Sequence, residues 1–225
     1  ILFTSTLNRT NPFFEMWSYW QLNLLYLTAH MFPSLGFTFG TFSHDIMDDP
    51  PRDSAEIITK NLMKIMAIQM LLMGIAIASA YYFSLWGVIP LNDTNFSHGT
   101  FLNGEEPIIG VRQIKARTMG YVVLFFLESL IMPLQIRRLN KPIEESFQDM
   151  EYKKEFLFYL PSFVVLIIII YSVRLQEFLG RTLNQSMNFT HLSVGDWGLC
   201  LLVSLPSIVA FEWIRRLFWK KGVRF

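Results

Sequence analysis

Long runs without a charged residue constrain this chain more than any other feature of its sequence. Residues 65–91 and 156–173 carry no charge, and residues 16–43 carry none apart from one histidine. A helix needs roughly 20 apolar residues to cross the hydrocarbon core of a bilayer. The pattern therefore predicts five membrane-spanning helices, near residues 16–39, 63–89, 117–136, 157–177 and 194–216.

Composition supports a membrane class and excludes several others. Hydrophobic residues make up 52% of the chain and charged residues only 16%, whereas a soluble domain usually carries about 25% charge. The net charge of +1 gives no basis for a nucleic-acid partner. Cys200 is the only cysteine, which excludes an internal disulfide and a cysteine metal cluster. We therefore interpret residues 1–225 as one all-α membrane domain surrounded by a lipid bilayer.

Lysine and arginine predict how the five helices are oriented. The connections 44–64 and 137–155 and the C-terminal residues 215–225 hold thirteen of the 19 basic residues. The positive-inside rule makes that side cytoplasmic. Because the number of spans is odd, we expect the N-terminus on the non-cytoplasmic side and the C-terminus in the cytoplasm.

A second pattern agrees with this orientation. Five Asn-x-Ser/Thr sequons all fall on the predicted non-cytoplasmic side, and their asparagines are candidate glycosylation sites. They are Asn8, Asn92, Asn95, Asn184 and Asn188. The chain also begins Ile-Leu-Phe shortly before the first apolar run, which favours a C-terminal piece of a longer protein.

The first cytoplasmic connection contains a specific marker. It reads HDIMDDPPRD over residues 44–53, and its two prolines hold an extended segment that cannot continue a helix. Asp-Ile-Met followed shortly by Pro-Pro-Arg resembles the loop between the sixth and seventh membrane helices of type II P-type ATPases, the calcium and sodium/potassium pumps. Pro33 stands twelve residues before Asp45, as the sixth-helix proline does in that family.

Two later segments resemble the same family. ARTMGYVVLFFLE, residues 116–128, is similar to its eighth helix, and DWGLCLLVSLPSIVAFEWIRRLF, residues 196–218, is similar to its tenth. The resemblance makes the five spans helices six to ten of a pump. It implies that the upstream parts, helices one to five and the cytoplasmic domains, bind ATP and Mg²⁺ and form an aspartyl phosphate.

The segment itself contains no phosphorylation motif and no nucleotide-binding glycine loop. The resemblance therefore implies a membrane part of an ATP-driven cation pump, in the plasma membrane or an endomembrane, with no catalytic residues of its own. Its expected work is to complete the ion pathway and to anchor the transport helices.

The resemblance also locates the ion ligands of the sixth helix. The family pattern Asn-Leu-x-Thr-Asp-x-x-Pro, counted back from Pro33, puts the three ligand positions at Tyr26, Ala29 and His30. None of the family's oxygen-bearing side chains is present there. Asn23 lies on the same helical stripe, one turn away.

We therefore take Tyr26, His30 and Asn23 as the ion-site candidates on this helix. Pro33 is expected to break the helix and free carbonyl groups near the site. Shifting the alignment to bring in Thr28 either loses the match of Pro33 or still supplies no carboxylate, so Thr28 is not assigned a role.

Glu128 is the remaining candidate. It matches a membrane glutamate that is a ligand in calcium pumps, and it is the only charge in residues 118–135. A charge at the centre of a bilayer costs about 2.5–3.5 kcal/mol on insertion scales for Asp, Lys or Arg, so it should face a polar partner or a cavity. Glu128 either binds an ion or proton or is a protonated side chain hydrogen-bonded to a neighbouring helix.

Three interpretations of the altered site remain open, because a histidine is a poor ligand for a hard cation. In the first interpretation, the pump carries a cation that is held mainly by helices four and five. Alternatively, it moves protons, with His30 and Glu128 as the titrating groups. The third interpretation is a non-transporting, degenerate pump homologue that acts as a membrane scaffold or subunit.

Overall fold

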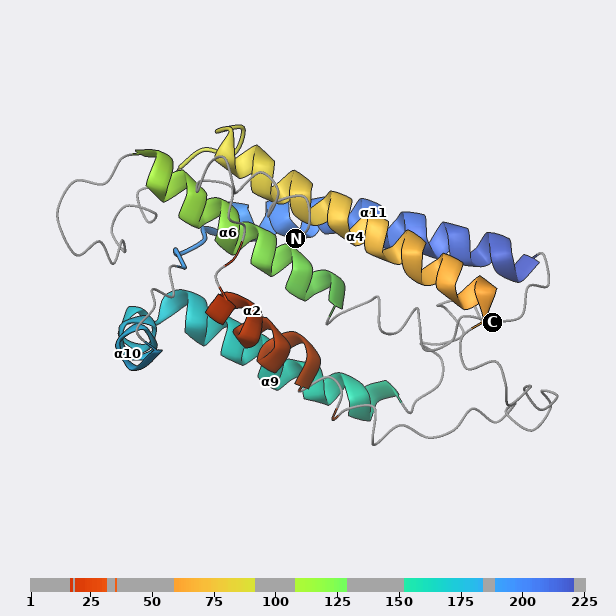
Figure 1. Cartoon of the computed structure of the whole chain (residues 1–225), viewed down its shortest axis with the longest axis horizontal. Helices are drawn as coiled ribbons and strands as arrows, with labels where there is room; N and C mark the ends of the chain where they lie inside the picture. Colours follow the sequence, from red (N-terminus) through yellow and green to blue (C-terminus); the bar gives the residue numbers. More distant parts are fainter. Residues whose placement is uncertain are drawn as a thin grey trace.

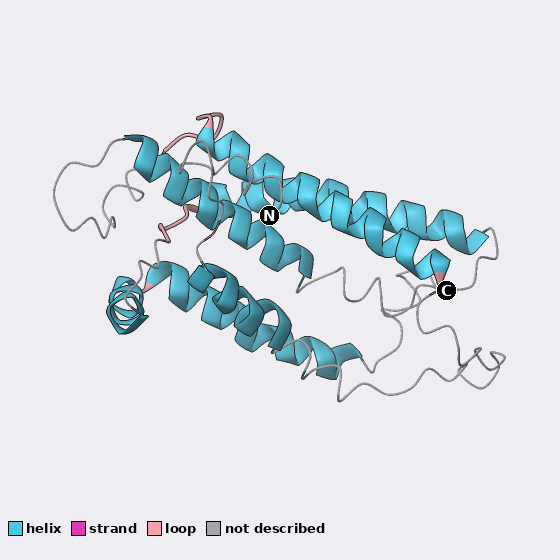
Figure 2. Cartoon of the chain, in the orientation of Figure 1, coloured by secondary structure: helices cyan, strands magenta, loops and turns pink. Residues whose placement is uncertain are grey.

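The structure, a computed structural model, describes residues 17, 19–31, 35, 59–91, 108–128, 152–183 and 189–220. Within these residues every regular element is a helix (Figure 1, Figure 2). The predicted all-α class is therefore confirmed for the described part of the chain. In chain order the elements are α2 (Tyr19–Leu25), the π-helix η2 (Tyr26–Met31), α4 (Lys60–Leu85), α6 (Ile108–Phe126), α9 (Tyr152–Tyr171), α10 (Val173–Leu183) and α11 (Val194–Lys220).

The long helices form two layers. Helices α4, α6 and α11 pack against one another, and η2 packs against α9 (Figure 1). Helix α6 is the central element, because most of its side chains between residues 111 and 127 are buried. The first layer is therefore a three-helix unit with α6 enclosed on nearly every side.

Helices α4 and α6 approach each other at Gly120 of α6. A Cβ added there would make ordinary van der Waals contact, 3.8 Å from Ile77 and 3.9 Å from Tyr81 of α4, and small residues are common where membrane helices pack. Helix α11 is tied to the same unit because Ser207 Oγ donates to the Leu72 carbonyl of α4 at 3.0 Å. These contacts hold the first layer together along its length.

Two of the helices are long and apolar enough to cross a membrane by themselves, Lys60–Leu85 and Val194–Phe218. They confirm the predicted membrane helices near 63–89 and 194–216. Helix α4 begins behind Thr59, whose side chain accepts from the Leu62 N–H at 3.1 Å as an N-cap.

The predicted span 157–177 needs a correction at its C-terminal end. Helix α9 stops at Tyr171, and the chain bends by 88° before Val173 continues as α10. Ser172 accounts for the break: its Oγ accepts from the Leu175 N–H at 3.3 Å and so caps a new helix. The bent pair counts as a third crossing if α9 and α10 are one span.

The other two predicted spans lie partly outside the described residues. Helices α2 and η2 cover 19–31 of the span predicted at 16–39, and α6 begins at Ile108, earlier than the predicted 117. The count of five spans and the orientation of the chain therefore stay predictions. Pro33, the Pro-Pro-Arg loop and the candidate glycosylation sites also lie outside the described residues; these sites are Asn8, Asn92, Asn95, Asn184 and Asn188.

Replacing Gly87 by alanine should destabilise the domain. Gly87 follows α4 with φ of 80°, and a Cβ there would meet the guanidinium end of Arg112, which would have to shift. A non-glycine residue held in such a conformation costs about 1–3 kcal/mol, so the apparent melting temperature in detergent should fall. Gly74→Ala is the matched control, because nothing lies within 4 Å of its Cβ position. A Gly87→Ala protein that melts as high as the Gly74→Ala protein would show that the turn does not require glycine.

Candidate functional site

A row of polar side chains runs along one face of α6. Thr118, Tyr121 and Glu128 recur with Phe125 at intervals of three and four residues, which places them on one side of a helix. Thr118 and Tyr121 are buried, and so is the Oε2 atom of the half-buried Glu128. Residues 127–128, which follow α6, are in π-helical conformation. The row therefore places hydroxyl and carboxylate oxygens inside the bundle.

The π-helix η2 meets this row through Thr28. The Thr28 Oγ1 and Tyr121 OH atoms lie 3.2 Å apart, and both side chains are fully buried. Thr28 Oγ1 also donates to the Leu24 carbonyl at 2.9 Å, a bond that hydroxyl side chains commonly make within a helix. Because the Thr28 proton is used there, Tyr121 donates the bond between the two hydroxyl groups. One buried polar contact thus joins η2 to α6.

The segment η2 is also where the resemblance places the ion ligands. A π-helix closes its hydrogen bonds one residue later than an α-helix, and short π-segments frequently mark functional sites. Tyr26 is 64% exposed, whereas Thr28 and Ala29 are buried. The buried residues Gln21, Leu25, Thr28 and Ala29 continue one stripe from α2 into η2.

Three of the four predicted ion-site residues, Asn23, Tyr26 and Glu128, have described side chains. Asn23 is half-buried in α2, and Glu128 is half-buried at the far end of the α6 row. His30 belongs to η2, but its side chain lies outside the described residues. The ion-binding roles of these residues stay predictions.

Sequence reasoning missed Thr28 and Tyr121. Each residue places a hydroxyl group inside an otherwise apolar run, and this feature could have identified them as candidates. The sequence does not show, however, that the two hydroxyl groups face each other. Among the described residues, no group of three His, Cys, Asp or Glu side chains gathers as a metal site. The junction instead offers oxygen atoms from Thr28 and Tyr121, the atom type that hard cations prefer. Glu128 lies seven residues after Tyr121, about 10 Å further along the helix.

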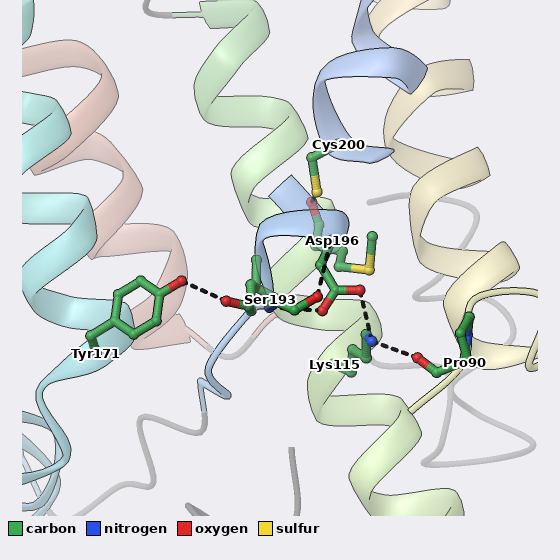
Figure 3. A network of polar contacts seen from close by, with 8 residues as sticks. Pro90, Lys115, Tyr171, Ser193, Asp196 and Cys200 are labelled. Carbon is green, nitrogen blue, oxygen red and sulfur yellow. Dashed lines mark hydrogen bonds and ion pairs between the residues drawn. The ribbon is translucent and has the colours of Figure 1, made fainter. Parts of the chain in front are cut away.

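A second polar cluster lies where α4 ends and α11 begins (Figure 3). Lys115 Nζ of α6 lies 2.8 Å from Asp196 Oδ1 of α11, with the two side chains 0% and 4% exposed. Lys115 Nζ also donates to the Pro90 carbonyl, just beyond α4, at 2.7 Å. A single ammonium group therefore joins all three helices of the first layer.

Asp196 has a second role in this cluster. Its Oδ2 accepts from the Ser193 N–H at 3.0 Å, while its own N–H donates to Ser193 Oγ at 3.2 Å. The reciprocal pair is a capping box at the start of α11, and a carboxylate in a first turn also interacts favourably with the helix dipole. The carboxylate that starts α11 is therefore the one that neutralises Lys115.

Tyr171 connects the second layer to this cluster. Its hydroxyl donates to the Leu192 carbonyl at 2.6 Å and accepts from Trp197 Nε1 at 2.7 Å, as Figure 3 shows in part. Nearby, the Thr190 N–H donates to Thr118 Oγ1 at 3.1 Å. The segment that precedes α11 is thereby held against both α6 and the end of α9.

Another buried ion pair lies near the opposite end of α11. Glu212 accepts from Arg215 Nε at 3.0 Å and from Arg215 Nη2 at 2.9 Å, and Arg215 is 1% exposed. Arg216 Nε adds a contact to Glu212 at 3.1 Å from a side chain that is 41% exposed. Such two-point guanidinium–carboxylate contacts fix geometry as well as charge.

Removing the Lys115 charge should destabilise the domain far more than removing an exposed one. Lys115→Met leaves the buried Asp196 carboxylate unpaired, which costs about 3–5 kcal/mol. Arg216→Met is the control, since a partly exposed pair contributes about 0–1 kcal/mol. Thermal unfolding in detergent should show the difference, and adding Asp196→Asn to Lys115→Met should recover much of the loss. Equal melting temperatures for Lys115→Met and Arg216→Met would contradict this role.

Comparison with known proteins identifies the family to which this helical domain belongs. The family model described as cation transporting ATPase, C-terminus, matches residues 19–217. No curated protein and no solved structure gives a significant match. The matched range contains all the described helices except the last residues of α11. The chain therefore belongs to the family of C-terminal membrane domains of cation-transporting P-type ATPases.

Proposed function

We propose that this domain is the helix six-to-ten part of a type II cation pump, in which the junction of η2 and α6 completes the cation pathway. The observation that carries the proposal is the π-helix Tyr26–Met31, joined to α6 by the buried Thr28–Tyr121 contact. An irregular helix whose polar groups lie inside a bundle is the arrangement that membrane transporters use around a bound ion.

The chemistry of the junction fits a hard cation or a proton. The hydroxyl oxygens of Thr28 and Tyr121 would supply neutral ligands or hydrogen-bond partners at the junction. Glu128, two turns further along the same face, would supply a carboxylate to the pathway. The exposed side of η2, with Tyr26 and Met31, is where upstream transport helices would bring further ligands. ATP and Mg²⁺ would bind to upstream cytoplasmic domains, and α4, α6 and α11 would serve as the anchor.

A second function is favoured by one specific observation. Ala29 is buried at a position where the family keeps an oxygen ligand, and it supplies no side-chain oxygen. A domain that has lost its ligands in this way would act as a membrane scaffold or subunit without transport. His30 at the next position fits either this role or a proton-transporting site.

Phosphoenzyme formation by the full-length protein tests these alternatives. It should be measured with ATP and Mg²⁺ across Ca²⁺, Na⁺, K⁺ and pH. A cation pump should respond to one of the cations, and a proton pump to pH alone. Absence of phosphoenzyme under every condition would contradict the transport proposal and support the scaffold.

Substitutions at the junction should then change the ion response. Glu128→Gln should raise the concentration of the activating ion needed for half-maximal effect by about tenfold or more, because a charged ligand contributes roughly 1.5–3 kcal/mol. Thr28→Val should have a smaller effect in the same direction, and His30→Asp should strengthen the response to a metal cation. Ser79→Ala is the matched control for Thr28, because Ser79 also bonds the carbonyl four residues back, that of Ile75, but on α4. Unchanged responses in all three junction variants would place the ion site elsewhere.

A further inference from the structure

Helix α10 differs from every other described helix in its direction. It leaves the end of α9 at 88°, and Figure 1 shows it end-on while the long helices run across the picture. Helix α9 has 20 residues, but Lys153, Lys154 and Glu155 stand in its first turn. Its uncharged part, residues 156–171, is about 24 Å long at 1.5 Å per residue, against roughly 30 Å for a hydrocarbon core. Helix α9 therefore reaches across most of the core before the chain turns into α10.

Specific hydrogen bonds fix the bend. Gln176 is buried, and its Nε2 donates to the carbonyls of Ile169 at 2.8 Å and Ile170 at 3.3 Å. Its Oε1 accepts from the Phe189 N–H at 3.3 Å. One side chain thus satisfies carbonyls at the end of α9 that lose their helical partners at the break. The bend between α9 and α10 is therefore stabilised by specific hydrogen bonds.

Charged and apolar side chains lie on different sides of α10. Arg174, Glu177 and Arg181 follow one another at intervals of three and four residues and so share one face. Arg174 and Glu177 are exposed. Phe178, four residues after Arg174, borders this face and is 63% exposed. Leu175 and Leu179 lie on the other side of Phe178 and are half-buried. A helix with a charged face and a separate apolar face is typical of helices that lie in a membrane interface.

Aromatic residues mark the same end of the bundle. Tyr171, the last residue of α9, is hydrogen-bonded to Trp197 in the first turn of α11. Trp86, at the end of α4, is 70% exposed. Tyrosine and tryptophan are enriched where a bilayer meets water, so these residues indicate the level of the interface. Because α10 starts directly after Tyr171, it begins at that level.

We propose that α10 lies flat in the lipid–water interface on the side of the membrane where α4 ends and α11 begins. Phe178, with Leu175 and Leu179, faces the acyl chains, while Arg174 and Glu177 face the headgroups and water. The occupant of the exposed apolar side is the bilayer itself. Apolar insertion carries the binding, since the two arginines and one glutamate of the charged face leave little net charge.

Spin labelling tests this placement. Single cysteines at Phe178 and Glu177, both exposed in the structure, are introduced into the full-length protein after its other accessible cysteines are replaced. Cys200 is buried and can remain. The proteins are reconstituted into phosphatidylcholine vesicles, and each nitroxide is tested for collisions with oxygen, which enters lipid, and with a water-soluble nickel chelate. Leu202→Cys on α11, 62% exposed, is the reference for a lipid-facing label.

The label at position 178 should resemble the Leu202 reference and collide with oxygen severalfold more than with nickel. The label at position 177 should show the reverse preference. Equal nickel access at positions 177 and 178 would overturn the proposal, because α10 would then stand in water. Low access of both reagents at position 178 would also overturn it, since another protein segment would then cover that side.

Discussion

The ion pair between Lys115 and Asp196 is the interaction on which the arrangement of the first layer depends. Its ammonium group is fully enclosed and is satisfied by one carboxylate and one carbonyl, each from a different helix or helix end. Buried pairs contribute little net stability, because desolvation offsets their attraction. Separating the helices would nevertheless leave a bare charge in a medium where charge is costly. We infer that the pair fixes the relative positions of α4, α6 and α11.

The second layer is attached to this unit differently. Thr28–Tyr121 joins η2 to α6, and Tyr171–Trp197 joins α9 to α11. Both attachments are neutral hydrogen bonds, each of about 0.5–1.5 kcal/mol net. The junction of η2 and α6 thus lies between two parts of the domain. On one side is the unit of α4, α6 and α11 with its buried ion pair, and on the other is the layer of η2 and α9, attached by neutral hydrogen bonds. Such a boundary is suited to a site that must open and close.

Much of this architecture could be predicted from the sequence, because hydropathy is a local property. The helices Lys60–Leu85 and Val194–Phe218 follow from uncharged runs alone. The bend after Tyr171 does not follow from the sequence. Arg174 and Glu177 show that the uncharged run has ended, but the change of direction is visible only in the structure, in the bonds of Gln176. The family of cation-transporting ATPases, too, follows from local motifs, and the match over residues 19–217 confirms it at that level. The type II subclass stays a proposal.

The contacts within the candidate site were less predictable. Lys115 lies at the edge of an apolar run and is 81 positions from Asp196 in the sequence, so nothing local pairs them. Likewise, the resemblance put Tyr26 at a ligand position, yet Tyr26 is 64% exposed. The buried stripe of this segment includes Thr28 instead, and only the structure shows that Thr28 faces Tyr121 of α6.

We expect α4, α6 and α11 to keep their relative positions during transport while η2 moves against α6. Cryo-electron microscopy of the full-length protein, with and without ATP, tests this division. The Lys115–Asp196 contact should stay at hydrogen-bond distance in both states, and α4, α6 and α11 should superpose. The π-helix η2 should shift relative to Tyr121. A broken Lys115–Asp196 pair in either state, or movement of η2 together with α4, α6 and α11 as one body, would contradict that division.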